Sequence, residues 1–403
     1  MPQWELPPYV LAVMEALRAA GRRGYLVGGS LRDLLRDMTP HDYDMTTDAT
    51  PDEMLEIFRD FRVIPTGLKH GTVTVMSEGH PIEVTTHRVD GAYLDSRRPE
   101  QVSFTRSLEG DLSRRDFTVN AMAWNPETGL VDLFDGRGDL SRGILRAVGD
   151  PETRFCEDAL RILRAFRFAA QLDFEIEPQT LRGAERAAAG LAHISVERIF
   201  SELSRMLEAP NAEAGMRALL RAGCEKYVFF DTVLQEKDAK INDLPADAAL
   251  RLAALMPRLE AGEAVALCRR YHAPNAFAER LCAYLEASRT PLPLTPFEAR
   301  RFVCRCWKGY EGGLLLQALR GADITAAKAL CHKVARDGTA VEVRRLAVNG
   351  RELQDQLGVL PQRTAQLLAR LQELVWKDPA CNKRPALLAA AQEICEKERE
   401  FCE

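Results

Sequence analysis

The chain contains 403 residues, more than one ordinary hydrophobic core accommodates, so we expect two to four domains. Hydrophobic residues make up 46% and charged residues 28%, a balance typical of a folded globular protein that excludes wholesale disorder. The net charge of −5 does not indicate a nucleic-acid-binding protein, so any contact with RNA requires a local basic patch.

Short β-rich segments and tight turns fill the first 150 residues. The runs GYLVGG, FRVIP, GTVTVM, PIEVTTHRV and QVSF alternate with helical stretches, which predicts a sheet with helices. After Asp150, apolar residues recur at three- and four-residue spacing, so successive helices are expected over FCEDALRILRAFRFAA, SVERIFSELSRMLEA and AEAGMRALLRAG, the second beginning after Ser195 as its N-cap. The polar segment 235–249 is a candidate linker between helices. The expected fold class is α+β, a small sheet-containing domain followed by a long helical arm.

The stretch YLVGGSLRD (25–33) places a glycine pair between a predicted strand and a predicted helix begun by Ser30. Gly28 and Gly29 allow a phosphate to approach the backbone, and the N-terminus of a helix favours negative charge. The stretch matches neither the dinucleotide fingerprint G-x-G-x-x-G nor the P-loop. It therefore predicts either an anion-binding corner or an ordinary strand-to-helix turn.

Two aspartates follow in HDYD (41–44). Asp42 and Asp44 stand at i and i+2, so in a strand they face the same side and repel each other unless a cation lies between them. Mg²⁺ is usually held by one or two carboxylates plus substrate phosphates. Glu83 in PIEVTT is a candidate third carboxylate from a neighbouring strand. The pattern predicts a site for magnesium and phosphate, and the alternative is a solvated Asp-rich turn.

A polar stripe runs along the predicted helix in EDALRILRAFRF. On a helical wheel it contains Asp158, Arg161, Arg164 and Arg167, while apolar residues cover the opposite side. Asp–Arg pairs at i,i+3 also stabilise ordinary surface helices, so the stripe by itself equally fits a salt-bridged face. The segment RRDFT, taken alone, would indicate a surface cluster of ion pairs.

Together these motifs resemble a known family. A glycine pair, a helix and then D-x-D is the layout of the DNA polymerase β nucleotidyltransferase superfamily. Several longer segments are similar to the class II tRNA nucleotidyltransferases (CCA-adding enzymes) and the related bacterial poly(A) polymerases. They are IEVTTHRVDGAYLDSRRPEQVSF (82–104), RRDFTVNAMAW (114–124), DPETRFCEDALRILRAFRFAAQLDFEI (150–176), HISVERIFSEL (193–203) and, more weakly, LAVNGRELQDQLGV (346–359). The resemblance runs continuously from about residue 20 to 205.

The resemblance implies a polymerase-β-like nucleotidyltransferase head followed by an all-helical neck, body and tail. The corresponding boundaries are 1–150 for the head, 151–205 for the neck that selects the base, 206–300 for the body, and 301–403 for the tail that binds tRNA. The implied reaction transfers CMP, CMP and AMP stepwise from CTP and ATP to the 3′ end of tRNA. Mg²⁺ is the implied cofactor, and pyrophosphate is released.

The resemblance also implies roles for individual residues. Asp42 and Asp44 match the metal ligands, and Glu83 is a candidate third catalytic carboxylate. Gly29 and Arg32 match contacts to the nucleotide phosphates, beside Gly28 and Ser30 of the corner. Arg115 and Asp116 match contacts to ribose and phosphate.

Base selection is the second implied role. Asp158 and Arg161 match the pair that chooses the incoming base, with Arg164 and Arg167 assisting with base or phosphate. Cytosine and adenine both present an exocyclic amine beside a ring-nitrogen acceptor, whereas uracil and guanine present a carbonyl beside an N–H. A carboxylate that accepts from the amine and a guanidinium that donates to the ring nitrogen therefore favour C and A.

Other activities share parts of this pattern. An A-adding enzyme or a poly(A) polymerase has nearly all of the same motifs. A CC-adding enzyme fits less well because DGAYLDSRRPEQVSF is present at length. The intact carboxylates argue against an inactive RNA-binding relative. RRDFT and EDALR argue against an enzyme that modifies a small molecule.

The sequence also bears on location and redox state. No stretch approaches the roughly 20 apolar residues of a membrane helix, and MPQWELPPYV lacks the layout of a secretion signal, so we expect a cytoplasmic protein. Ten cysteines are scattered, and the only close pair is Cys304 and Cys306, which predicts reduced thiols rather than a zinc site. The oligomeric state stays open.

Overall fold

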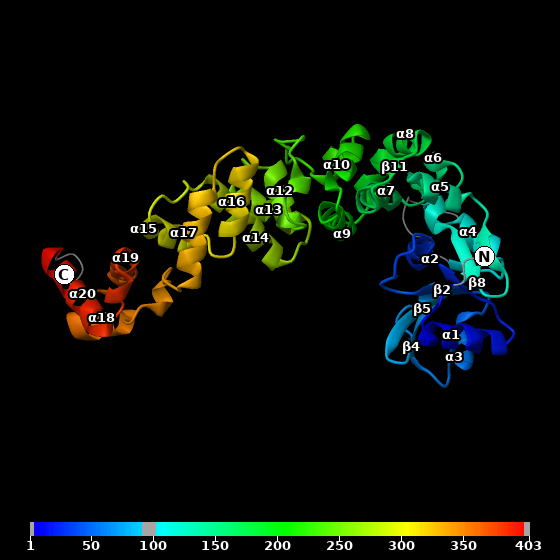
Figure 1. Cartoon of the computed structure of the whole chain (residues 1–403), viewed down its shortest axis with the longest axis horizontal. Coiled ribbons are helices and arrows are strands. Elements are labelled where there is room, and N and C mark those ends of the chain that lie inside the picture. Colours follow the sequence, from blue (N-terminus) through cyan, green and yellow to red (C-terminus); the bar gives the residue numbers. More distant parts are fainter. Residues whose placement is uncertain (1–3, 91–101, 399–403) are drawn as a thin grey trace. The chain divides into compact units, whose positions relative to one another are not determined.

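The computed structural model describes residues 4–90 and 102–398 and divides into two compact units, 1–232 and 233–403 (Figure 1). The sheet lies in the first unit, and the described part of the second is helical. Most of the predicted loop DGAYLDSRRPEQVSF falls on 91–101, outside the described residues.

A seven-stranded mixed sheet forms the centre of the head. Its strand order is β3-β4-β5-β2-β1-β8-β9, and only the β2–β5 pair is parallel. The strands are β1 (Gly24–Val27), β2 (Asp44–Thr47), β3 (Arg62–Ile64), β4 (Thr72–Ser77), β5 (His80–Thr86), β8 (Met122–Asn125) and β9 (Gly129–Asp132). Two small pairs lie outside it, namely β6 (Arg88–Asp90) with β7 (Val102–Phe104) and β10 (Ile144–Leu145) with β11 (Glu175–Ile176).

The predicted β-rich runs all contain strands, as their content of β-branched and aromatic residues predicts. In β4, Val73 and Val75 are fully buried, while Thr72 and Thr74, which alternate with them, are only partly buried. The parallel register of β2 and β5 pairs Asp44 with Glu83. Two carboxylates that lie far apart in the sequence therefore stand beside each other.

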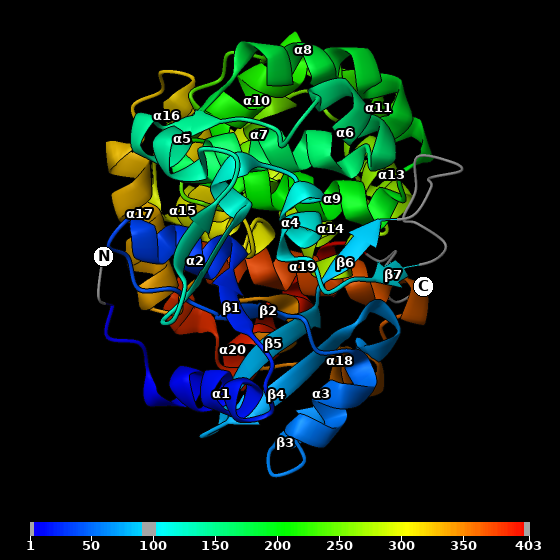
Figure 2. The same ribbon diagram turned by 90° about the vertical axis from the view of Figure 1, so that its right-hand side faces the viewer.

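Eleven helices complete the described part of the first unit. They are α1 (Pro8–Ala19), α2 (Gly28–Leu35), α3 (Pro51–Ile57), α4 (Leu108–Ser113), α5 (Gly136–Arg142), α6 (Pro151–Glu157), α7 (Leu160–Leu172), α8 (Pro178–Ala187), α9 (Val196–Leu207), α10 (Ala212–Arg221) and α11 (Glu225–Val228). Helices α1 and α3 pack beside β4, and α7 packs against α9 and α10 (Figure 2). Ser195 is the N-cap residue of α9, although its side chain makes no capping hydrogen bond.

The helix predicted over FCEDALRILRAFRFAA is interrupted. The prediction that Asp158 lies on one helical face with Arg161, Arg164 and Arg167 was therefore wrong. Asp158 has φ −145° and ψ 102° and lies between α6 and α7. Its Oδ1 accepts a hydrogen bond of 3.1 Å from the Leu160 N–H, so the side chain replaces a helical partner at the start of α7. A salt-bridged surface helix is also contradicted, because Arg161 and Arg167 are buried.

The described part of the second unit contains nine α-helices. They are α12 (Ala248–Leu255), α13 (Ala261–Arg270), α14 (Asn275–Arg289), α15 (Pro296–Arg305), α16 (Tyr310–Leu319), α17 (Thr325–Arg336), α18 (Gly350–Leu357), α19 (Pro361–Lys377) and α20 (Arg384–Lys397). Helices α14 and α16 approach closely because Gly313 faces Ala287, where a Cβ at position 313 would lie 2.2 Å from the alanine Cβ.

The polar segment 235–249 lies at the start of the second unit and is irregular up to Asp247, apart from a short 3₁₀ turn at Ile241–Asp243. Of the domain boundaries expected from the sequence, 150/151 coincides with the start of α6, whereas 205/206 and 300/301 fall within α9 and α15. Across the described ranges, no helix is both long enough and apolar enough to cross a bilayer. Cys304 and Cys306 are free thiols.

Candidate active site

One cavity of about 480 Å³ in the first unit collects most of the predicted site residues. The glycine corner, β2, β5, the segment after α4, and α7 all contribute to its wall. The predicted residues that line it are Gly28, Gly29, Arg32, Asp44, Glu83, Arg115, Asp116, Arg164 and Arg167. Arginines and carboxylates from segments more than a hundred residues apart therefore face one space.

Gly28 lies at the glycine corner of this wall. Its φ of +66° lies in the left-handed region that favours glycine. A Cβ at this position would lie 3.6 Å from Arg115 Nη1 and 3.9 Å from Asp44 Oδ2. The corner therefore leaves backbone, rather than side chain, between the two charged groups.

Ser30 has a different position from the one predicted. Helix α2 begins at Gly28, so Ser30 is inside the helix and buried, and it does not line the cavity. Its Oγ donates to the Val27 carbonyl at 2.9 Å and accepts from the Asp44 N–H at 3.4 Å. The serine thus ties the first turn of α2 to the start of β2, which fixes the backbone that carries Asp44.

Asp44 and Glu83 form the carboxylate pair of the cavity. Burial, followed by the neighbouring charge of Glu83, raises the pKa of Asp44 to about 6. Adjacent carboxylates such as Asp44 and Glu83 are a donor set suited to a hard divalent cation. Among the described residues, no group of three or more His, Cys, Asp or Glu side chains is arranged to hold a metal.

Asp42 lies just before β2 rather than within it. Its side chain is 76% exposed and pairs with His41 at 3.1 Å, and it does not line the cavity. The prediction that Asp42 and Asp44 project from one strand was therefore wrong, because β2 begins only at Asp44. The charge of Asp42 nevertheless contributes to the raised pKa of Asp44, so the two carboxylates are neighbours.

Asp111, which the sequence analysis did not single out, supports two arginines of the wall. Its carboxylate is fully buried and accepts from Arg114 Nη2 at 2.7 Å and from Arg115 Nη2 at 3.0 Å. Burial alone would raise the pKa of Asp111, but the charges of Arg115 and Arg114 lower it well below its usual range. The position of Arg115 therefore depends on a residue four positions earlier in the same segment.

Asp116 and Arg164 form an ion pair across the cavity wall. Asp116 Oδ2 accepts from Arg164 Nε at 2.8 Å and from Nη2 at 2.5 Å, and Asp116 Oδ1 accepts from Asn120 Nδ2 at 3.3 Å. Burial raises the pKa of Asp116, but the charge and hydrogen bonds of Arg164 outweigh it and lower the pKa to about 2. Asp116, Phe117 and Thr118 of RRDFT are thus buried and its two arginines are only partly exposed, so the segment is not a surface cluster of ion pairs.

Replacing Arg164 by leucine is expected to destabilise the first unit by about 3 kcal/mol, because it leaves the Asp116 carboxylate buried and unpaired. Thermal unfolding at pH 7 should then occur about 6–12 °C lower. Since the folded pKa of Asp116 is lowered, the pair stabilises the wild type above pH ~4, and this contribution is lost as the pH falls towards 2.

The matched control is the double variant Arg164→Leu/Asp116→Asn, which removes the unpaired charge and should regain part of the loss. Equal unfolding temperatures for the single and double variants would show that Asp116 is not the source of the cost.

Arg167 and the residues that hold it complete the basic side of the wall. Its Nε donates to Glu202 Oε2 of α9 at 2.5 Å, and its Nη1 donates to Gln171 Oε1 at 2.6 Å. Burial lowers the pKa of Arg167, and Glu202 partly opposes this effect. Glu202 belongs to HISVERIFSEL, so that motif acts by positioning a cavity arginine.

The predicted base-selecting pair lies beside the cavity rather than in its lining. Asp158 Oδ2 accepts from Arg198 Nη2 of α9 at 3.0 Å, and Arg161 Nη1 donates to Glu157 Oε2 at 2.6 Å. Arg161 Nη2 also donates to the carbonyl of Arg114, a lining residue, at 3.0 Å. Arg161 therefore contacts the cavity wall through Arg114.

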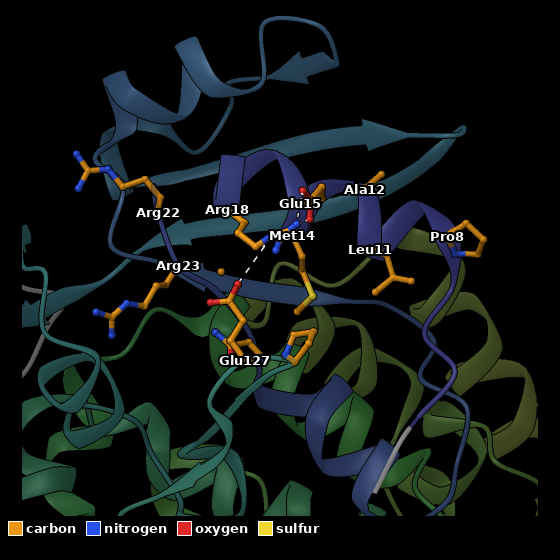
Figure 3. A pocket seen from close by; sticks show the side chains of 12 residues that line it. Pro8, Leu11, Ala12, Met14, Glu15, Arg18, Arg22, Arg23 and Glu127 are labelled. Atoms are coloured by element: carbon orange, nitrogen blue, oxygen red, sulfur yellow. Dashed lines mark hydrogen bonds and ion pairs between the residues drawn. The ribbon is translucent and has the colours of Figure 1, made fainter. Parts of the chain in front are cut away.

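A second cavity of about 570 Å³ lies between α1 and the turn after β8 (Figure 3). Its wall is mostly apolar, with Leu11 and Met14 from α1. The nearby charges compensate one another, since Arg18 pairs with Glu15 at 2.7 Å and with Glu127 at 3.9 Å. None of the predicted site residues lines this cavity, so the active-site candidate is the smaller, basic cavity.

Comparisons with known proteins agree with this geometry. Residues 24–146 match the family described as the poly A polymerase head domain, and 173–232 match the probable RNA and SrmB binding site of polymerase A. These ranges contain the glycine corner, the carboxylates Asp42, Asp44 and Glu83, the RRDFT segment, and Arg198 and Glu202 of α9.

Relatives of known function match over nearly the whole length. The CCA-adding enzyme of Streptococcus gordonii is 37% identical over 392 residues, covering 95% of this chain and 96% of that protein. The Streptococcus sanguinis enzyme of the same name is 36% identical, with 95% and 96% covered.

Solved structures give the same result. The structure of the Bacillus stearothermophilus CCA-adding enzyme in complex with CTP aligns with a TM-score of 0.83 and 30% identity, over 98% of this chain and 100% of that one. These two relatives and this solved structure each match at least 95% of this chain and at least 96% of their own length. The chain therefore belongs to the CCA-adding enzyme family of nucleotidyltransferases.

Proposed function

We propose that this protein completes the 3′ end of tRNA by adding C, C and A from CTP and ATP, with release of pyrophosphate. The observation that carries the proposal is a single cavity in which Asp44 and Glu83 face the Gly28 corner and six arginines. Full-length relatives that carry the CCA-adding name support this activity over an A-adding or poly(A)-adding one.

Mg²⁺ is the proposed cofactor, with Asp42 and Asp44 as its ligands. The donor set fits because both groups are carboxylates and because burial, followed by the charge of Glu83, raises the pKa of Asp44, so that a cation would stabilise its ionised form. When bound, Mg²⁺ neutralises the charge of the triphosphate and lowers the pKa of a bound hydroxyl.

The triphosphate is proposed to lie against the glycine corner and the arginines. Gly28 and Gly29 leave room for phosphate oxygens, and Arg32, Arg115 and Arg164 supply positive charge. Arg115 Nε is buried and has no hydrogen-bond partner among the described residues, so an acceptor from a ligand would satisfy it.

The chemical step consists of attack by the terminal hydroxyl of the RNA on the α-phosphorus, in line with the departing pyrophosphate. Glu83 is the proposed further carboxylate on the hydroxyl side, since it stands next to Asp44 in the parallel register. Holding the two reacting groups together and opposing the developing charge are the main contributions of the protein to the rate.

Base selection is proposed for Asp158 and Arg161. The Asp158 carboxylate would accept from the exocyclic amine of C or A, while the Arg161 guanidinium would donate to the ring nitrogen. Arg198 and Glu157 are hydrogen-bond partners of this pair, and Arg161 also donates to the carbonyl of the lining residue Arg114. Arg164 and Arg167 are assigned to the phosphate side, because both line the cavity itself.

The experiment uses purified protein with tRNAs that end before CCA, after C and after CC, each with labelled CTP or ATP. We expect CTP incorporation on the first two ends and ATP incorporation on the third. Incorporation of ATP alone, on the third end only, would indicate an A-adding enzyme. Failure to incorporate either nucleotide on any end would refute the transferase activity.

A further inference from the structure

Phe168 of α7 lies among three arginines of the active-site cavity. The guanidinium carbons of Arg167, Arg164 and Arg32 lie 4.0, 5.3 and 5.7 Å from the centre of its ring. Phe168 itself lines the cavity and is 8% exposed. One aromatic ring is therefore the common neighbour of arginines from α2 and α7.

Each of these arginines has its own carboxylate. Arg32 Nη2 donates to Asp33 Oδ1 at 2.8 Å, Arg164 pairs with Asp116, and Arg167 pairs with Glu202. Those carboxylates come from three different segments, so none of them holds the set together. Like charges this close repel one another, and the negative face of an aromatic ring attracts guanidinium groups. Asn120 also connects Arg32 with Asp116, the partner of Arg164, but the Phe168 ring is the neighbour that all three arginines share.

Packing against Phe117 fixes the Phe168 ring. The ring meets Phe117 edge to face, with the ring centres 5.8 Å apart and the planes at 80°. Phe117 is fully buried and directly follows Asp116. The orientation of Phe168 is therefore tied to the segment that carries Arg115 and Asp116, as well as to α7.

We propose that Phe168 is a positioning residue for triphosphate binding, acting through Arg32, Arg164 and Arg167. The inference rests on the proposed function, because it takes the nucleoside triphosphate as the anion that these arginines bind. The negative face of the ring keeps the three guanidinium groups close together before the ligand enters. An aliphatic side chain of similar size fills the space but offers no such face.

The experiment measures CTP binding, and separately the KM and kcat of CTP addition, for a series of ring-fluorinated phenylalanines at position 168. Fluorine weakens the negative face while the ring keeps nearly the same shape. We expect the Kd for CTP and the KM to rise stepwise, by about tenfold for a trifluorinated ring, with kcat within about threefold of the wild type. Phe168→Leu should bind CTP as weakly as the most fluorinated member of the series, and Phe168→Tyr should bind CTP as tightly as the wild type.

The matched control is the same series at Phe166, which is fully buried two residues earlier in α7 and does not line the cavity. It should leave the Kd unchanged. Equal CTP binding across the series at position 168, or an equal rise at both positions, would overturn the inference. A wild-type protein that binds CTP but adds none to tRNA would overturn the proposed function alone, since the Kd series still tests the role of the ring.

Discussion

Replacing Asp44 by asparagine is expected to reduce nucleotide addition by at least about 10³-fold and, at the same time, to raise the thermal stability of the metal-free protein. The loss of activity follows from its proposed role as a metal ligand in the cavity. The gain in stability follows from burial and from Glu83, which make the ionised Asp44 unfavourable in the folded state. Activity and stability should therefore change in opposite directions.

The raised pKa fixes the pH dependence of this gain. Because the folded pKa of Asp44 is about 6 and its ordinary value is 3.8, the folded protein holds the proton more tightly. Wild-type stability should fall as the pH rises from about 4 to about 6 and then stay constant. The Asp44→Asn variant should be more stable by at most about 3 kcal/mol at pH 7 and nearly equal to the wild type at pH 4.

Thermal unfolding with EDTA and with added Mg²⁺ measures the effect. Mg²⁺ should stabilise the wild type and leave Asp44→Asn unchanged, since only the folded wild type binds the ion. The control is Asp42→Asn, which should also lose activity but gain little stability, because Asp42 is largely exposed and carries no burial penalty. An Asp44→Asn enzyme with near-normal addition would contradict the metal role.

Replacing Asp158 by alanine is expected to reduce discrimination between CTP and UTP by about 10–100-fold. The reason is that the carboxylate is the proposed acceptor for the exocyclic amine, and sites that hydrogen-bond a polar group reject analogues lacking it. The measurement is kcat/KM for all four nucleoside triphosphates on a tRNA that ends before CCA.

A matched control tests whether the loss of an ion-paired carboxylate from α6 changes the selectivity by itself. Glu152→Ala removes an exposed carboxylate of α6 that pairs with Arg186 at 3.1 Å, and it should leave the selectivity unchanged. Unchanged selectivity in Asp158→Ala would limit Asp158 to linking α6, α7 and α9 through Arg198 and the Leu160 N–H.

The sequence pattern predicted the parts of the site that depend on local geometry. The strand-to-helix glycine corner and the pairing of Asp44 with a carboxylate of PIEVTT both follow from strand periodicity and turn chemistry. The break at Asp158 did not follow, because the apolar spacing continues through it and the competing hydrogen bond to Leu160 is a side-chain choice.

Other parts of the site depend on long-range contacts that periodicity does not record. Glu202 reaches Arg167 from α9, and Asn120 bridges Arg32 and Asp116. Asp111 stands four residues before Arg115, so the run DLSRRDFT did contain a signal for it. The sequence analysis did not identify Phe168, because only the fold shows which cations surround its ring.

The most direct test of the central claim is to sequence the 3′ ends of a tRNA lacking CCA after incubation with the wild-type protein, Mg²⁺ and all four nucleoside triphosphates together. A single cavity that selects C and A and then stops predicts a uniform product ending in CCA, with no uridine or guanosine added. Tails of repeated adenosine, or incorporation of uridine or guanosine at rates comparable to cytidine, would contradict it.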